Sequence, residues 1–191
     1  AEPHFTMFWS NKVPVHFERD ASGKSTTVTA IAGRIGDAIP IPPPAESWAA
    51  RPESDVAIWT IRMEPNARWT IPAAHADSNR RLYFFSGASL AVADRDVPLT
   101  HYVELRPDAD VDIVNGDGVS ELLLLQGRPI GEPIAQRGPF VMNTEEEIRQ
   151  AFIDYKQTQF GGWPWPSSYP VHPRDEGRFA RHADGTIERA K

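Results

Sequence analysis

Short apolar segments separated by turn signals run through the first two thirds of the chain. Thr26 to Ala32 is rich in β-branched and small apolar residues, and Gly33 follows it. Val56 to Met63 is apolar on both faces, which is typical of a buried strand. Further strands are predicted at residues 68–71, 81–85, 89–93, 101–105, 111–114 and 121–125. Many short strands spaced by about 8–12 residues predict a sandwich or barrel of antiparallel strands.

One segment towards the C-terminal end follows a helical period instead. Its apolar face is made by Ile148, Ala151, Phe152 and Tyr155. Thr144 can cap the helix, and Glu147 three residues later completes a capping box. Acidic residues fill the first turn, where the helix dipole favours negative charge, and Gly161 and Gly162 end the helix. A lone amphipathic helix that follows a run of strands is expected to pack on a sheet or on a partner.

The two ends of the chain carry large apolar groups without a clear period. Residues 1–25 include Phe5, Met7, Phe8 and Trp9, which we expect to pack against another surface. The tail, residues 161–191, begins with an aromatic and proline-rich half that we expect to lie along the domain. Its charged end, from Arg174 onwards, is expected to be loose. The sequence therefore divides into an N-terminal or interdomain extension (1–25), a barrel (26–130), a segment ending in the helix (131–160) and the tail (161–191).

Composition removes several classes of function. The 191 residues suffice for one well-buried domain with extensions. A net charge of −6 with interspersed acids and bases argues against a nucleic-acid surface. No apolar run approaches the roughly 20 residues of a membrane helix. The absence of cysteine excludes disulfides and thiolate metal sites. The N-terminus lacks the pattern of a signal peptide, and the expected compartment is the cytoplasm.

The segment from Gly131 to Phe160 carries a family resemblance. Its order of Gly-Glu-Pro-Ile, then Gly-Pro-Phe-Val-Met-Asn-Thr, then an acidic helix ending in Phe-Gly resembles the C-terminal region of pirins. Pirins are two-domain cupins, so the resemblance implies an all-β cupin fold with a helix at its end. Two earlier stretches extend the resemblance over most of the chain: Ala30 to Gly33, and Met63 to Ala67.

The resemblance also implies where the family's chemistry lies. In pirins the N-terminal cupin holds iron through three histidines and a glutamate, and none of those positions exists in this chain. Family members are linked to oxygenation of the flavonol quercetin, or to regulation of transcription and of metabolic enzymes. The resemblance therefore implies iron in the N-terminal cupin of a parent protein, and that cupin is the expected partner of this chain.

The usual cupin metal motifs can be tested residue by residue. With the glycine of the first motif placed on Gly87, its two histidines fall on Ala73 and His75, and its glutamate falls on Arg80. With the proline of the second motif on Pro98, its histidine falls on Val103. One imidazole remains, and a single imidazole cannot hold an ion against water. We expect no metal and no catalytic residue in this chain.

Three residues are the candidates for binding a small ligand in the barrel: His75, Arg80 and Tyr83. A plainer interpretation makes His75 a rim histidine beside Asp77, and makes the Arg80-Arg81 pair a solvated strand end. The tail residues Trp163 and Trp165 could bind a ligand, but packing on the domain or on a partner domain explains them better.

Three functional hypotheses remain open. In the first, the chain is the metal-free second half of a pirin-like protein; it braces the metal domain and offers surface to protein partners or to a second copy. In the second, the parent is an iron-dependent dioxygenase similar to quercetin 2,3-dioxygenase, and this half shapes its pocket. In the third, the chain is an independent single cupin that binds a small molecule. We favour the first, in which this chain alone is not an enzyme.

Overall fold

A computed structural model describes residues 7–163, 165–168, 171–182 and 184–190. The chain divides into two compact units. Ser10–Ile130 forms one unit, which we call the sandwich unit. Gly131–Lys191, together with the N-terminal residues up to Trp9, forms the other, which we call the helix unit. None of the helices formed by the residues described is long and apolar enough to cross a membrane.

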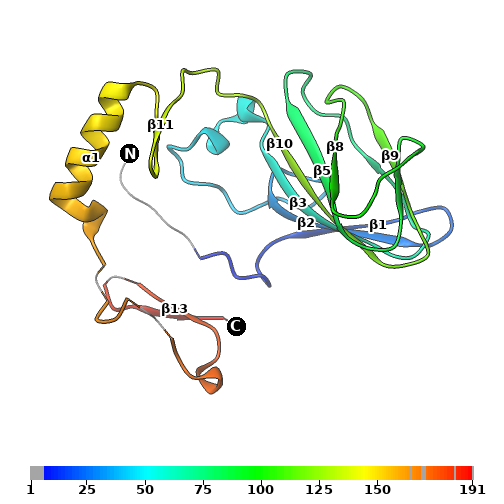
Figure 1. The fold of residues 1–191 in the computed structure, drawn as a ribbon. Helices are drawn as coiled ribbons and strands as arrows, with labels where there is room; N and C mark the ends of the chain where they lie inside the picture. Colours follow the sequence, from blue (N-terminus) through cyan, green and yellow to red (C-terminus); the bar gives the residue numbers. More distant parts are fainter. Residues whose placement is uncertain (1–6, 164, 169–170, 183, 191) are drawn as a thin grey trace. The chain divides into compact units, whose positions relative to one another are not determined.

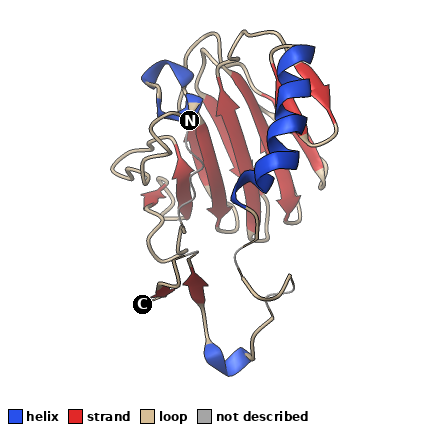
Figure 2. Cartoon of the chain, turned by 90° about the vertical axis from the view of Figure 1, so that its left-hand side faces the viewer, coloured by secondary structure: helices blue, strands red, loops and turns tan. Residues whose placement is uncertain are grey.

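The larger sheet of the sandwich unit has six antiparallel strands (Figure 1). In spatial order these are β1 (Val15–Arg19), β2 (Ser25–Ala32), β3 (Ala57–Met63), β10 (Ser120–Gly127), β5 (Asn79–Ser86) and β8 (His101–Glu104). Irregularities interrupt the register of β2 on β3 and of β10 on β5. Figure 2 shows strands of this sheet side by side.

The smaller sheet has four antiparallel strands. Its order is β4 (Arg68–Ile71), β9 (Val111–Asn115), β6 (Leu90–Val92) and β7 (Arg95–Asp96). Buried residues of both sheets, among them Ile61 and Leu122 from the larger and Trp69 and Ile113 from the smaller, belong to one apolar cluster. The two sheets therefore pack face to face as a sandwich. Two short 3-10 turns, Trp48–Ala50 and Pro52–Ser54, lie in the connection from β2 to β3.

The helix unit is built around α1 (Glu145–Thr158). The predicted capping box is present: the Glu147 amide donates to Thr144 Oγ1 at 3.2 Å, and the Thr144 amide donates to the Glu147 carboxylate at 2.8 Å. A hairpin of β11 (Ala135–Arg137) and β12 (Phe140–Met142) contacts α1. The rings of Phe140 and Phe152 meet edge to face, 4.9 Å between centroids. The tail adds two 3-10 turns, Gln159–Gly161 and Arg174–Glu176, and a hairpin of β13 (Phe179–Arg181) and β14 (Ile187–Arg189).

The predicted all-β architecture with one C-terminal helix is confirmed, and the differences lie at the chain ends and turns. Val15–Arg19, within the stretch assigned to an extension, forms β1 and pairs with β2. Arg95–Asp96, which lies between the predicted strands 89–93 and 101–105, pairs with β6 as β7. The charged end of the tail is not simply loose, because its two short strands pair across the turn at Gly185.

Candidate functional site

At one end of the larger sheet, the inner face carries a row of both polar and apolar side chains. Gln126 on β10 lies opposite Ala57 on β3 and Arg80 on β5, and the Leu105 amide donates to the Arg80 carbonyl at 3.0 Å. We call these four residues the rim row. The next inner row is apolar and consists of Trp59, Leu124, Leu82 and Val103. The rim row thus puts a cation and an amide directly beside the apolar core.

Arg80 is almost fully buried, with 2% of its surface exposed. Its Nη2 donates to the Pro72 carbonyl at 2.9 Å. Its Nε and Nη1 are buried and have no hydrogen-bond partner among the residues described. Burial lowers the pKa of Arg80, and the charges of Asp55 and Asp110 offset this only in part. An arginine does not lose its proton in a protein, so this guanidinium keeps a charge that its surroundings compensate incompletely.

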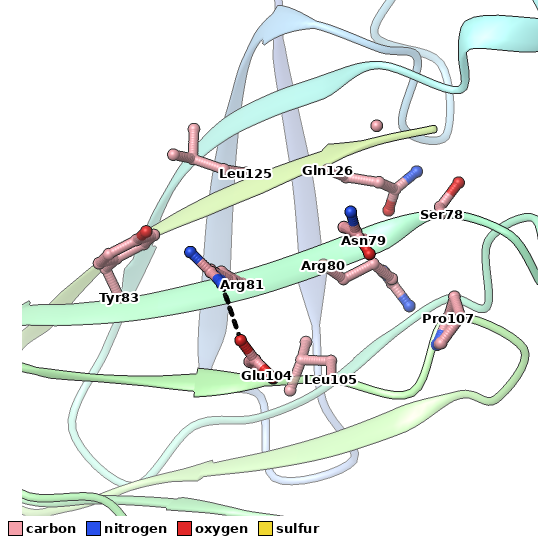
Figure 3. Close-up of a pocket in the computed structure, with 11 residues that line it drawn as sticks. Ser78, Asn79, Arg80, Arg81, Tyr83, Glu104, Leu105, Pro107, Leu125 and Gln126 are labelled. Atoms are coloured by element: carbon pink, nitrogen blue, oxygen red, sulfur yellow. Dashed lines mark hydrogen bonds and ion pairs between the residues drawn. The ribbon is translucent and has the colours of Figure 1, made fainter. Parts of the chain in front are cut away.

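Gln126 lies beside Arg80 on the inner face of the sheet, and only one end of its side-chain amide is hydrogen-bonded. Its Nε2 donates to the Asp55 carbonyl at 3.1 Å, whereas its Oε1 is buried without a donor among the residues described. A hollow of about 530 Å³ borders the same strand ends, but its exposed lining comes from side chains on the opposite face of the sheet, among them Arg81, Tyr83, Glu104 and Leu125 (Figure 3). Figure 3 shows Arg80 on β5 beside Gln126 on β10, with the end of the Arg80 side chain reaching towards Pro107.

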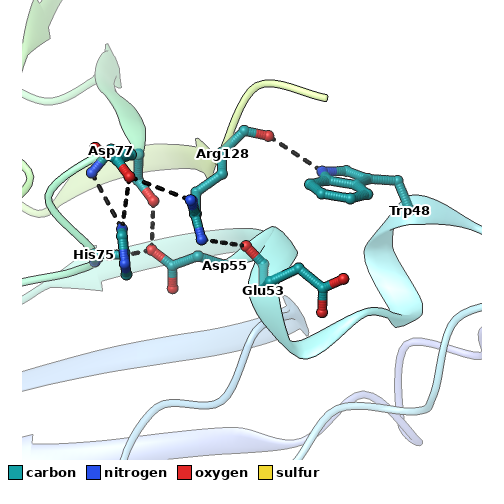
Figure 4. A network of polar contacts seen from close by, with 7 residues as sticks. Trp48, Glu53, Asp55, His75, Asp77 and Arg128 are labelled. Carbon is teal, nitrogen blue, oxygen red and sulfur yellow. Dashed lines mark hydrogen bonds and ion pairs between the residues drawn. The ribbon is translucent and has the colours of Figure 1, made fainter. Parts of the chain in front are cut away.

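A network of polar contacts fixes the loops beside this row (Figure 4). The carboxylate of Asp55 accepts from the His75 amide at 3.0 Å and from the Ser78 hydroxyl at 2.5 Å. Arg128 donates to Asp77 at 3.2 Å and to the Glu53 carbonyl at 3.3 Å. On the other side of the rim, Asp110 accepts from the Ala73 amide at 2.7 Å. Both acids that attract Arg80 are therefore occupied by other donors.

The three ligand candidates from the sequence occupy different places. Arg80 points inward, whereas Tyr83 lies on the opposite face of β5, where its ring is 5.4 Å from that of Tyr102. The His75 ring is half exposed on the rim loop, and its Nδ1 accepts from the Asp77 amide at 3.2 Å. Arg80 and Tyr83 both border the hollow, but His75 does not. The structure does not gather the three into one site.

The sequence analysis did not single out Gln126, although the pattern of buried positions along its strand indicates it. The predicted strand ended at Leu125, but β10 continues to Gly127. Side chains alternate between the faces of a strand. A strand extended by one residue therefore puts Gln126 on the buried face that Leu122 and Leu124 share. A side-chain amide at a buried position directly after Leu122 and Leu124 is the feature that could have identified it.

The positions of the cupin metal motifs can now be placed. Ala73 and His75 follow β4, Arg80 is the buried cation of the rim row, and Val103 packs against the apolar core. Among the residues described, no group of three or more His, Asp or Glu side chains is placed to hold a metal ion. This donor set does not fit a cupin metal, because it offers one imidazole and a positive charge.

The solvent-facing side of the larger sheet, which we call the outer face, carries several exposed apolar side chains. One row in register runs across all six strands: Val15, Thr29, Thr60, Leu123, Tyr83 and Tyr102. Phe17 on β1 and Phe85 on β5 add two phenyl rings beside this row. These two rings, Val15 and Tyr102 are each about half exposed. Charged side chains flank this row on the same face: Arg81 pairs with Glu104 at 2.8 Å and lies over the Tyr102 ring, and the exposed Arg62 lies opposite Glu121.

Comparison with known proteins decides the family. Residues 58–161 match the pirin C-terminal cupin domain. The chain belongs to the pirin family. This match confirms the resemblance carried by Gly131 to Phe160, and it identifies the β-sandwich as a cupin.

Three relatives illustrate the extent of the match. A Pseudomonas aeruginosa protein provisionally named quercetin 2,3-dioxygenase is 32% identical over 134 residues, which are 68% of this chain and 44% of that protein. Human pirin is 39% identical over 70 residues, 36% of this chain and 24% of that protein. A crystal structure of quercetin 2,3-dioxygenase from Acinetobacter baumannii superposes with a TM-score of 0.62 at 24% identity, over 80% of this chain and 49% of that one. The pirin domain described here thus spans less than half of each relative.

Proposed function

We propose that this chain is the C-terminal half of a two-cupin pirin, that it binds no metal, and that it supports an iron-bearing N-terminal cupin of the same protein. The observation that carries the proposal is the apolar outer face. Monomeric proteins rarely expose contiguous apolar patches beyond a few hundred Å². A row in register across six strands is wide enough to contribute to a stable interface, which buries roughly 800 Å² on each partner.

The proposed occupant of the outer face is the N-terminal cupin of the same protein. The chain covers 44% of its Pseudomonas relative and 24% of human pirin, so more than half of each relative lies outside the match. A domain joined in the same chain is present at a high effective concentration, so even a modest apolar face can hold it. Self-association or another protein partner is the competing outcome, and the test below separates them.

The metal-free part of the proposal rests on Arg80. A buried guanidinium stands where the carboxylate ligand of the cupin motif would be, and its charge would repel a divalent ion. We expect the purified chain to retain no iron after dialysis and to bind none in a calorimetric titration. Binding of one iron per chain that is lost in His75→Ala would contradict this part of the proposal.

The names of the relatives favour a second proposal for the whole protein. The parent would be a dioxygenase similar to quercetin 2,3-dioxygenase, with iron in its N-terminal cupin and this half closing one side of the pocket. Oxygen uptake with quercetin by the two-cupin protein, and none by this chain alone, is the expected result. Equal activity of the N-terminal cupin without this half would remove the pocket-shaping role.

The docking proposal is tested by mixing this chain with the separately expressed N-terminal cupin encoded by the same gene. Sedimentation velocity should show a one-to-one complex. The variant Phe85→Ser removes a half-exposed ring from the outer face and should weaken that complex about tenfold or more. The matched control is Ile39→Ser, which removes an exposed apolar side chain from a loop of the same unit and should leave the affinity unchanged.

The outcomes divide the alternatives cleanly. A complex that responds to both variants alike would show that the outer face is not the interface. A homodimer of this chain that persists in the presence of the N-terminal cupin would assign the outer face to a second copy. A monomer that ignores the N-terminal cupin would overturn the proposal.

A further inference from the structure

The tail of the helix unit contains a hollow of about 470 Å³ that the docking proposal does not use. Volumes of roughly 300–1,000 Å³ are typical of sites for small molecules. The side chains that line it include Trp163, Trp165, Val171, His172, Phe179 and Arg181. All of them come from one short stretch of the chain, and none belongs to the outer face. We call this hollow the tail pocket.

Two pairs of aromatic rings border the tail pocket. The ring centroids of Trp163 and Trp165 are 4.5 Å apart, and those of His172 and Phe179 are 4.7 Å apart. The Trp163 indole donates to the Ser167 carbonyl at 2.7 Å, which fixes the orientation of its ring. Yet 54% of Trp163 is exposed, so packing within the helix unit does not cover it. A second flat ring is the group that such aromatic faces accommodate best.

The charges beside these rings are positive. Phe179 and Arg181 are two positions apart on β13 and therefore share one face of the strand (Figure 1). The Arg181 guanidinium lies over the Phe179 ring, 6.0 Å from its centroid. Arg189 lies over the same ring from β14, but it pairs with Glu176 at 3.4 Å. Arg181 has no ion pair among the residues that the structure describes.

The ionisable side chains that line the tail pocket are both basic. They are Arg181 and His172, and no described carboxylate lines the pocket with them. The pocket therefore combines aromatic faces with an unpaired guanidinium, a group that hydrogen-bonds a carboxylate through two parallel N–H donors.

We propose that the tail pocket binds a small aromatic carboxylate. The ring of the ligand packs against Trp163 and Trp165, and its carboxylate accepts hydrogen bonds from Arg181. A neutral aromatic molecule keeps the ring contacts but leaves the guanidinium in water. An aliphatic acid keeps the ion pair but loses the ring contacts. The proposal therefore predicts a preference for the aromatic acid over both.

The test compares three ligands with the whole chain: 2-naphthoate, the uncharged 2-naphthalenemethanol and the non-aromatic cyclohexanecarboxylate. Each is titrated into the 15N-labelled chain at constant ionic strength, and the indole N–H resonances of Trp163 and Trp165 are followed. Naphthoate should shift both resonances saturably. It should bind about fivefold more tightly than either analogue, the size of one accessible ion pair or one aromatic contact. No saturable shift with naphthoate would overturn the proposal without need of a variant.

Two variants and a control assign the contacts. Arg181→Met should weaken naphthoate binding about fivefold and leave the affinity for naphthalenemethanol unchanged, because only the ion pair is lost. Trp165→Leu should weaken the binding of both ring compounds about fivefold. Arg174→Met removes an exposed arginine of the same tail that does not line the pocket, and it should bind naphthoate like the unaltered chain.

Contrary outcomes are equally specific. Naphthoate binding that is unchanged in both Arg181→Met and Trp165→Leu would place the ligand elsewhere. Equal affinities for naphthoate and cyclohexanecarboxylate would show that charge alone attracts the acid, which would also overturn the proposal. Self-association in sedimentation velocity that prevents naphthoate from binding would assign the tail pocket to a second copy of the chain. If Trp165→Leu does not fold, the three titrations of the unaltered chain decide.

Discussion

The two faces of the larger sheet are built by the same strands but differ in what their side chains do. On β5, Phe84 points inward and is 1% exposed, while Phe85 points outward and is half exposed. The inner face packs into one apolar core, which Arg80 and Gln126 interrupt at one end of the sheet and the buried Thr26 and Ser120 interrupt at the other. The outer face also carries apolar side chains, yet within the sandwich unit no second sheet packs on it. The inner face therefore accounts for stability, and we assign the outer face to association.

The largest expected effect separates these two roles at neighbouring positions. Phe84→Ala should lower the free energy of unfolding by about 3–5 kcal/mol, because it leaves a cavity in the core. Phe85→Ala should change it by less than about 1 kcal/mol, because its ring is half in water already. Urea unfolding followed by tryptophan fluorescence measures both. Equal losses of unfolding free energy in the two variants would contradict the different roles assigned to the two faces.

A smaller effect should stay within the helix unit. Thr144→Ala removes the hydroxyl that accepts from the Glu147 amide and should cost about 1 kcal/mol of helix stability. Thr144→Ser keeps the hydroxyl and is the control. Helical circular dichroism should fall with temperature earlier in the alanine variant, with little change in the unfolding of the sandwich. A matching shift in the sandwich transition would show that the two units unfold together.

The smallest expected effect is a loss of stability at low pH in the edge strand β1. Asp20, in the turn between β1 and β2, accepts from Ser22, Lys24 and Arg68, and these bonds lower its pKa to about 2. Because the folded-state pKa is depressed, its contribution to stability is complete above the ordinary value of about 3.9 and is lost as the pH falls through about 2.

Asp20→Asn tests this contribution directly. The variant should be slightly less stable at neutral pH, and it should lack the part of the acid-induced loss between about pH 4 and pH 2 that Asp20 supplies. Hydrogen exchange of the β1 amides against pH measures the effect where it acts. Identical pH profiles of the variant and the unaltered chain would show that the carboxylate does not hold the edge strand.

The sequence predicted those elements whose signals are local. The helix was found because its cap, its first-turn acids and its apolar period all lie within one stretch, Thr144 to Gly161. The central strands were found because β3 and β10 are apolar enough to mark burial. β1 was not predicted because its apolar side chains do not mark the buried face. Val15 and Phe17 point outward, whereas His16 lies opposite Val28 on the buried side.

The candidate site was less accessible to prediction. The sequence named Arg80 but grouped it with Tyr83, three positions away and therefore on the other face of the strand. Its true neighbour, Gln126, is 46 residues along the chain and is brought there only by the pairing of β5 with β10. Register across a sheet depends on packing of the whole sandwich, which no local pattern of Arg80 or Gln126 contains.

The most direct test of the docking account is hydroxyl-radical labelling of side chains in this chain alone and in the two-cupin protein encoded by the same gene. The account predicts that Phe17, Phe85 and Tyr102 are labelled readily in the isolated chain and are protected in the two-cupin protein, while labelling of Ile39 stays the same. Equal labelling of the three aromatic side chains in both proteins would contradict the central claim that the outer face binds the N-terminal cupin.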